Sequence, residues 1–278
     1  MMKTQILVLG MALSLFVIGC NKDDDNNTPA TPLTAAEVRA NAEMDNISDD
    51  VGYIAESESD ETSSAGRTSG GNPSFLSGCA EVTTTISGTT WIRTIDFGTT
   101  NCTLFNGNMV RGKIIISFTN NFAATTRNIS YSFENFYHNN RHVEGNRTIV
   151  KTIVNGHPQA TISLDMTVTM ENGAVYHRTG QRVREFIAGF LTPLNLYDNE
   201  FAITGSWVTT FPSGTVQTAT ITSALIVKWN CLYIVNGTIG ITRNNTATTA
   251  VLNYGDGNCD DQATVTINGV VYPIDLGN

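Results

Sequence analysis

A stretch of alternating apolar and polar side chains that ends in a tight turn limits most strongly how this chain can fold. Every second residue from Ile162 to Met170 is apolar, and the turn pair Asn172 and Gly173 follows. That pair is the strongest short signal for a β-hairpin, and the alternation gives a strand with one buried and one solvated face. The sequence therefore predicts an antiparallel hairpin. If its turn has two residues, Met170 lies opposite Val175.

The same pattern continues along the chain. From residue 81 onward the sequence is rich in Thr, Ile and Val and is punctuated by turn dipeptides, which is typical of antiparallel strands joined by hairpins. No helical pattern separates these strands, so a parallel α/β sheet is excluded. The prediction is an all-β, mainly antiparallel meander, curled into an open barrel or half-barrel, in one domain over residues 75–278. Strands are expected at 81–97, 109–120, 127–137, 142–154, 159–171, 174–187, 200–211, 215–228, 231–243, 247–254, 261–267 and 270–276.

One amphipathic helix is predicted over residues 34–56. Thr34 and Glu37 have the spacing of a capping box, and apolar residues recur at helical intervals up to Ala55. A lone helix of this length is marginal in water, so we expect it to pack on the sheet and close one side of the core. Its acidic side chains would then face solvent or the basic middle strands. A flexible Ser/Gly/Thr-rich linker is expected at 57–74.

Four cysteines occur in two copies of one pattern. Residues 95–102 and 252–259 share the order apolar, Asp/Asn, Phe/Tyr, Gly, two free positions, Asn, Cys, and another cysteine precedes each copy. An even number of cysteines in an oxidising compartment indicates disulfides. A duplicated hairpin favours two local disulfides, although cross-pairing between the copies stays open. The expected pairs are Cys79 with Cys102 and Cys231 with Cys259.

The N-terminal region has the pattern of a secretory signal. Lys3 is basic, residues 6–18 are largely apolar, and a small residue precedes Cys20. This resembles the bacterial lipobox, which implies cleavage of a signal peptide at residues 1–19 and acylation of Cys20. An ordinary secretory signal with an incidental cysteine is the alternative. Residues 20–33 are expected to form a lipid-anchored flexible tether.

The residues after Cys20 also resemble the signal that sends lipoproteins of Bacteroidota to the outer face of the outer membrane. With the duplicated cysteine motif and residues 133–137 and 143–145, the chain resembles a group of flavobacterial lipoproteins of unknown function. That resemblance implies an outer-membrane, outward-facing location and contact with the lipoprotein maturation and export machinery, but no activity. The residues of the export signal are Lys22, Asp23, Asp24 and Asp25.

The acidic charge is concentrated in the N-terminal arm. The formal net charge is −9, but residues 20–62 hold twelve of the acidic residues, whereas residues 63–278 hold thirteen of each sign. A neutral body without a basic stripe argues against nucleic acid as a partner. Residues 111–184 carry nine basic and four acidic side chains. We interpret this excess as complementary charge between adjacent strands, in preference to a polyanion site.

No catalytic set is evident. The four histidines, His138, His142, His157 and His177, are dispersed without metal-ligand spacing, and we interpret them as turn and surface residues. No nucleophile elbow, zinc-protease motif or phosphate loop is present. The sequence therefore predicts a protein that is not an enzyme and needs no cofactor.

Two weak ligand candidates remain. Asp165 is predicted opposite Gly180 with Arg178 and Arg182 as diagonal neighbours, which could form a small acidic-ligand site or a cross-strand charge ladder. A second candidate, for calcium, has alternating oxygen ligands but lacks the glycine and the bidentate glutamate of a calcium loop. Its residues are Asp256, Asn258 and Asp260.

Two functions fit these patterns. The first is a noncatalytic cell-surface lipoprotein that acts as an interaction or scaffold module. The alternative is a lipid or small-ligand carrier that uses an apolar groove in the curved sheet. The carrier needs a concave apolar pocket, whereas a scaffold fills that face with its own side chains.

Overall fold

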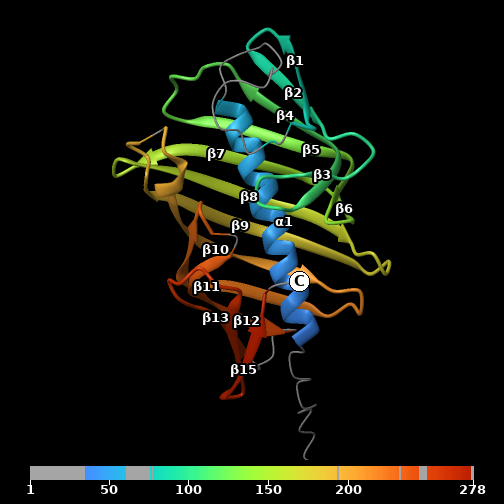
Figure 1. Cartoon of the computed structure of the whole chain (residues 1–278), viewed down its shortest axis with the longest axis vertical. Helices are drawn as coiled ribbons and strands as arrows, with labels where there is room; N and C mark the ends of the chain where they lie inside the picture. The colour runs from blue at the N-terminus through green and yellow to red at the C-terminus, as the bar shows by residue number, and fades with distance from the viewer. Residues whose placement is uncertain are drawn as a thin grey trace, which may run out of the picture.

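The computed structural model describes residues 35–60, 76, 78–192, 194–231, 233–243 and 249–276. One helix, α1 (Ala35–Asp60), lies on one side of a large antiparallel sheet (Figure 1). The predicted all-β meander with one packed helix is confirmed; the sheet curls, but it closes only in part. The strands are β1 (Glu81–Ser87), β2 (Thr90–Asp96), β3 (Cys102–Thr103), β4 (Met109–Thr119), β5 (Arg127–His138), β6 (Arg141–Glu144), β7 (Asn146–Val154), β8 (His157–Thr169), β9 (Val175–Ala188), β10 (Glu200–Thr210), β11 (Val216–Lys228), β12 (Ile234–Arg243), β13 (Thr249–Asp256), β14 (Gln262–Ile267) and β15 (Val270–Asp275), with a short 3-10 helix at Leu196–Asp198.

Sequence neighbours are also sheet neighbours along nearly the whole path, which runs β1-β2-β4-β5-β6-β8 and on to β15. β6 and β7 follow one another in the same position of the sheet, and each of them pairs with β5 on one side and with β8 on the other. The single strand predicted at 81–97 is instead a hairpin, with Ser87 opposite Thr90. Gly88, whose φ is +59°, supplies the left-handed backbone of its turn.

The predicted β8–β9 register is wrong by one residue. Thr169, not Met170, lies opposite Val175. The cause is the turn: the Met170 N–H donates to the Ala174 carbonyl, and the Gly173 N–H donates to the Met170 carbonyl. This loop is one residue longer than the two-residue turn that was assumed.

The core lies between α1 and the inner face of the sheet. The alternating residues of β8 are buried as predicted, with Met166 and Val168 fully enclosed. Met44 and Val51 of α1 are also fully buried, so the helix packs on the sheet as expected. Its axis runs across the strands (Figure 1), and its described side chains are mostly buried.

The helix continues to Asp60, beyond the predicted end at residue 56. The last turn was predicted to be linker because it is polar. In the structure the Ser59 hydroxyl donates to the Glu56 carbonyl, and Asp60 pairs with Arg127 and Lys151 of the sheet. Tertiary contacts therefore extend a helix that its local sequence does not favour.

Both predicted disulfides are confirmed. Cys79 bonds to Cys102 and Cys231 bonds to Cys259, with Cα–Cα distances of 5.8 and 5.7 Å. Each closes a loop within one copy of the repeat, as the duplicated-hairpin argument requires. The chain segment just after the predicted linker is thereby joined to β3.

Several predicted features lie outside the described residues. They are the signal peptide, the lipidation residue Cys20, the export residues, the tether and residues 61–74 of the linker. Among the residues that are described, no helix combines the length and apolar character needed to cross a membrane.

Candidate interaction site around the acidic helix

Every acidic side chain of α1 contacts a basic side chain of the sheet. These contacts extend from β12 at the start of the helix to β2 near its end, so the helix is held along its whole length. The pairs are Glu37 with Arg243, Glu43 with Arg141, Asp45 with Arg178 and Arg182, Asp49 with Arg182, Asp50 with His138, Glu56 with Arg184, Glu58 with Arg93, and Asp60 with Arg127 and Lys151.

The prediction that the acidic side chains of the helix face solvent or the basic middle strands is confirmed in its second form. The interpretation of the basic excess as pairing between adjacent strands is wrong for most of these residues. Seven of the nine Lys and Arg side chains between residues 111 and 184 contact α1. Six of them form ion pairs with it: Arg127, Arg141, Lys151, Arg178, Arg182 and Arg184. The seventh, Arg147, donates a hydrogen bond to the Ser48 hydroxyl at 3.1 Å. Only a minority make the cross-strand contacts we predicted, such as Lys113 with Asp96 and Glu134. The basic middle strands and the acidic arm are therefore two sides of one intramolecular interface.

Asp45 is at the centre of this interface. Its carboxylate accepts hydrogen bonds from both Arg178 and Arg182, and all three side chains are almost completely buried. Burial lowers the pKa of Arg178 to about 10, although the Asp45 charge opposes that shift. The two arginines therefore remain charged at neutral pH. Without Asp45, Arg178 would be a buried cation with no carboxylate partner, and Arg182 would keep only its contact with Asp49.

The indole of Trp207 forms the other wall around these arginines. The Arg182 guanidinium carbon lies 4.1 Å from the ring centroid, and that of Arg178 lies 5.2 Å from it, distances at which cation–π attraction is effective. Gly180 allows the backbone of β10 to approach closely at Trp207, because a Cβ there would lie 2.5 Å from the Trp207 Cα. The arginines are thus held between a carboxylate on the helix and an aromatic face on the sheet.

A second polar cluster surrounds Asp50. His138 Nε2 lies 2.7 Å from one carboxylate oxygen, and the amides of Asn106 and Asn108 donate to the carboxylate at 2.7 and 2.6 Å. His138 is 1% exposed, so its interpretation as a turn or surface residue is wrong. The inner face of β5 reaches the helix at this point, and the histidine side chain is enclosed there.

The weak acidic-ligand candidate is not assembled. Because of the shifted register, Asp165 lies opposite Thr179 and on the outer face, where its carboxylate is 3.1 Å from His177. Arg178 and Arg182 point to the inner face and bind α1. The carboxylate and the two guanidiniums are therefore on opposite sides of the sheet.

The weak calcium candidate forms an exposed turn after β13. The Asn258 amide donates to Asp256 at 2.8 Å, and the Asp260 carboxylate accepts the Gln262 N–H at 3.0 Å. Within the described part of the chain, no group of three or more His, Cys, Asp or Glu side chains could hold a metal ion.

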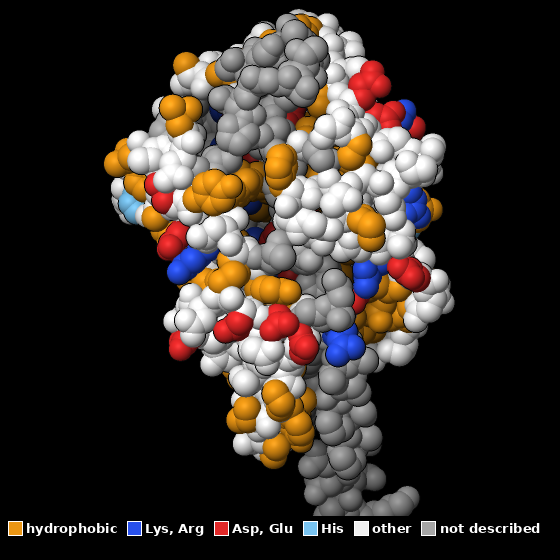
Figure 2. Space-filling view, in the orientation of Figure 1, with side chains coloured by type: hydrophobic (Ala, Val, Ile, Leu, Met, Phe, Trp, Pro, Cys, Tyr) orange, Lys and Arg blue, Asp and Glu red, His pale blue; other side chains and the backbone are white. Residues whose placement is uncertain are grey.

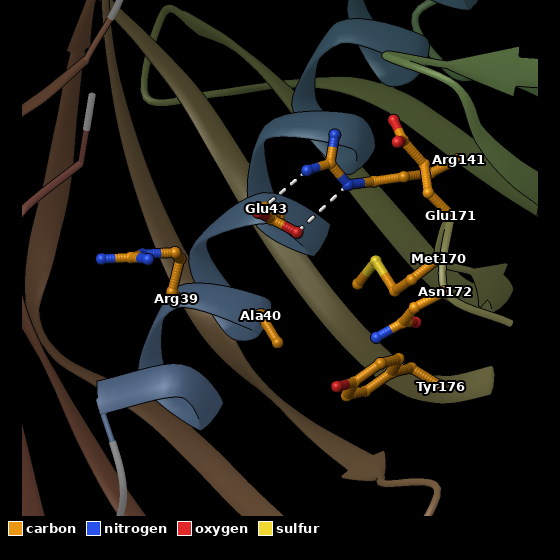
Figure 3. A pocket seen from close by; sticks show the side chains of 8 residues that line it. All are labelled: Arg39, Ala40, Glu43, Arg141, Met170, Glu171, Asn172 and Tyr176. Carbon is orange, nitrogen blue, oxygen red and sulfur yellow. Dashed lines mark hydrogen bonds and ion pairs between the residues drawn. The ribbon is translucent and has the colours of Figure 1, made fainter. Parts of the chain in front are cut away.

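An open cleft of about 390 Å³ lies beside the first half of α1 (Figure 3). The small Ala40 side chain and the ring of Tyr176 face each other across it, and Met170 adds apolar surface. Arg141 closes one end with two hydrogen bonds to Glu43, at 2.9 and 3.1 Å. Burial and then the Glu43 charge raise the pKa of Tyr176. The cleft is open and lined mainly by polar and charged side chains, with only Ala40, Met170 and the Tyr176 ring adding apolar surface; no pattern in the sequence indicated it.

No family model matches the chain, and no similar protein was found among curated proteins or solved structures. The function therefore has to be argued from the contacts just described.

Asp49 should give the interface a distinct pH dependence. Partial loss of solvation against the sheet raises its pKa to about 6 from 3.8, although the side chain is 32% exposed and the charge of Arg182, 3.2 Å away, opposes the shift. The folded state then binds more protons than the unfolded state between these two values, so this residue's contribution to stability falls as pH rises from about 4 to 6. We expect Asp49→Asn to be more stable than the wild type at pH 7.5.

The measurement is urea unfolding of both proteins from pH 4 to 7.5. The advantage of the Asp49→Asn variant should disappear toward pH 4, where the wild-type carboxyl is protonated. An Asp60→Asn variant serves as the control, because that carboxylate is 47% exposed. A pH-independent difference for Asp49→Asn, or one of opposite sign, would contradict the argument.

Proposed function

We propose that this chain is a noncatalytic lipoprotein, attached through acylated Cys20 and carried to the cell surface, where it acts as an interaction or scaffold module. The lipobox-like pattern before Cys20 and the acidic residues Asp23, Asp24 and Asp25 support the address. The way in which α1 is bound supports the role.

The observation that carries the proposal is the position of α1 between anchor and sheet. Fourteen residues separate Cys20 from Ala35, and fourteen extended residues reach at most about 50 Å. The helix that follows is held by ion pairs from β12 to β2. An anchor at Cys20 would therefore act on the whole sheet through α1 and keep the module close to the lipid.

The outer face of the sheet is the broad surface left for a partner. A cross-strand row of small hydroxyl side chains spans β4, β5, β7 and β8, and it lines a shallow hollow of about 290 Å³ next to Ile92. The hollow combines these hydroxyl groups with the apolar side chains of Ile92 and Ile115 and with the exposed carboxylate of Asp165. The row consists of Ser117, Ser130, Thr148 and Ser163.

The carrier alternative would use the opposite, inner face. That face holds α1, with Met44, Ile47, Val51 and Ile54 in the core. A carrier would have to release the helix before an apolar ligand could enter, or use the smaller cleft beside Tyr176. Cutting the chain between α1 and β1 and removing the helix therefore tests this alternative too.

The address is tested by changing Cys20 and the acidic run separately. We expect Cys20→Ala to leave the protein unprocessed or released from the membrane. Replacing Asp23, Asp24 and Asp25 by Ala should keep it anchored but facing the periplasm, because only the export signal is lost. Protease treatment of whole cells measures exposure, and the wild type should be digested. Unchanged digestion of the triple variant would refute the export proposal.

A further inference from the structure

The C-terminal hairpin of β14 and β15 ends in an exposed apolar tip. Val270, Val271 and Tyr272 are 52, 60 and 48% exposed. They sit beside the turn at Asn268 and Gly269. Apolar side chains gather at this end of the molecule in Figure 2, where Figure 1 places β15. Val270 and Tyr272 share one face of the strand and Val271 lies on the other, so exposed apolar side chains flank the tip on both faces, which needs an explanation.

The tip is exposed because the sheet extends beyond the helix. Apolar residues of β14 continue the inner-face alternation, and Val265 and Ile267 are buried. The first described ion pair of α1, from Glu37 to Arg243, is on β12. β15 is three strands further on. Val270 and Tyr272, which pair with those β14 residues, therefore lie three strands beyond this ion pair of α1, the only helix longer than one turn among the described residues.

The charge distribution favours a lipid surface as the occupant. No residue from Gln262 to Ile274 is charged. The acidic residues Asp260, Asp261 and Asp275 lie at the other end of the hairpin, one strand length from the tip. An uncharged tip with aliphatic side chains and a tyrosine has the composition that settles at a membrane–water interface.

The position of the hairpin agrees with this occupant. α1 begins at the same end of the molecule as β15 (Figure 1), and the proposed anchor precedes the helix by fourteen residues. Pairing with a second copy is less suited to this edge, because Pro273 in the middle of β15 has no N–H to offer another strand.

We infer that the tip of the β14–β15 hairpin inserts into the surface of the lipid bilayer to which the chain is anchored. This inference rests on the proposed function, since it needs a membrane near the start of α1. The acyl chains would hold the protein at the membrane, and the hairpin would give it a second point of contact. Two contacts would fix which side of the sheet faces the lipid.

The test uses the chain from residue 21 with an N-terminal histidine tag, bound to phosphatidylcholine vesicles that carry a nickel-chelating lipid. The tag replaces the acyl group, so the result does not depend on whether Cys20 is acylated. Tyr272→Trp reports on the tip. Tyr197→Trp, 75% exposed in the connection between β9 and β10, is the matched control. The signal of the three native tryptophans is subtracted with the wild type.

Lipids brominated on their acyl chains should quench the indole of the Tyr272→Trp variant about three times as strongly as that of Tyr197→Trp, because interfacial aromatic rings reach the upper acyl region. Adding Val270→Ser and Val271→Ser should abolish the difference, whereas Leu191→Ser and Leu194→Ser should preserve it. Equal quenching in both variants would overturn the inference. The inference would also be overturned if the indole fluorescence of the Tyr272→Trp variant changed with protein concentration but not with lipid bromination. That outcome would indicate that a second copy of the chain covers the tip.

Discussion

The Asp45→Ala variant should unfold with a free energy about 3–5 kcal/mol below that of the wild type, because removing one partner of a buried ion pair leaves the other charge without compensation. Here two charges are left: Arg178 and Arg182 are 0% and 2% exposed and share the Asp45 carboxylate. Asp49 keeps only a partial hold on Arg182. Urea unfolding at pH 7.5, followed by circular dichroism, measures the loss.

The matched control is Asp60→Ala at the end of the same helix. That carboxylate also contacts two cations, but it is 47% exposed, so its removal should cost no more than about 1 kcal/mol. A triple variant with Asp45→Leu, Arg178→Met and Arg182→Met should recover much of the lost stability, since apolar residues of similar volume tolerate such a site. Equal losses for Asp45→Ala and Asp60→Ala would show that burial of the cluster is not what matters.

Cutting the chain between α1 and β1 should leave the two pieces bound to each other. A specific protease site inserted within residues 61–75 separates the helix from the body without deleting either. The pieces should co-elute in buffer, because Met44, Ile47, Val51 and Ile54 are buried against the sheet and each side chain of this kind contributes about 1.5–3 kcal/mol when fully buried. Moderate urea should release the helix.

The body without the helix should bind a hydrophobic dye and lose most of its thermal stability. Adding a synthetic peptide of residues 34–60 should reverse both changes, and the same peptide with Asp45→Ala should do so poorly. A body that melts at the wild-type temperature after the helix is removed would mean that α1 belongs to the tether. A helix-free body that stays folded and takes up lipid would instead favour the carrier alternative.

Local patterns in the sequence were sufficient for most of the fold. The alternation around Met166 predicted the buried face of β8 correctly, and the repeated cysteine motif predicted both disulfides. The capping-box spacing of Thr34 and Glu37 predicted where α1 begins, and the apolar spacing predicted its buried face. These features depend on residues close together in the chain, or on a repeat that makes distant ones comparable.

The arrangement around α1 could not be read from such patterns. Arg178 and Arg182 alternate along β9 like residues of a solvated face, yet their partner is more than 130 residues away on the helix. The sequence signal for this interface is the charge of its segments: residues 20–62 are acidic and residues 111–184 are basic, so the two segments are complementary. The register error that misplaced Asp165 had a smaller cause: an Asn-Gly pair does not distinguish a two-residue turn from one with an extra residue.

The separation between the two ends of the helix–sheet interface has a kinetic consequence. Glu37 pairs with Arg243, a residue 206 positions later in the chain, so the first turn of α1 is synthesised early but cannot reach this partner until β12 has been made. Non-local contacts of this kind slow folding. Docking of the first turn of α1 should therefore be a late step, whereas the pairs of Asp50 with His138 and of Glu58 with Arg93 can form earlier. A sheet that lacks β12 would hold only the later turns of the helix.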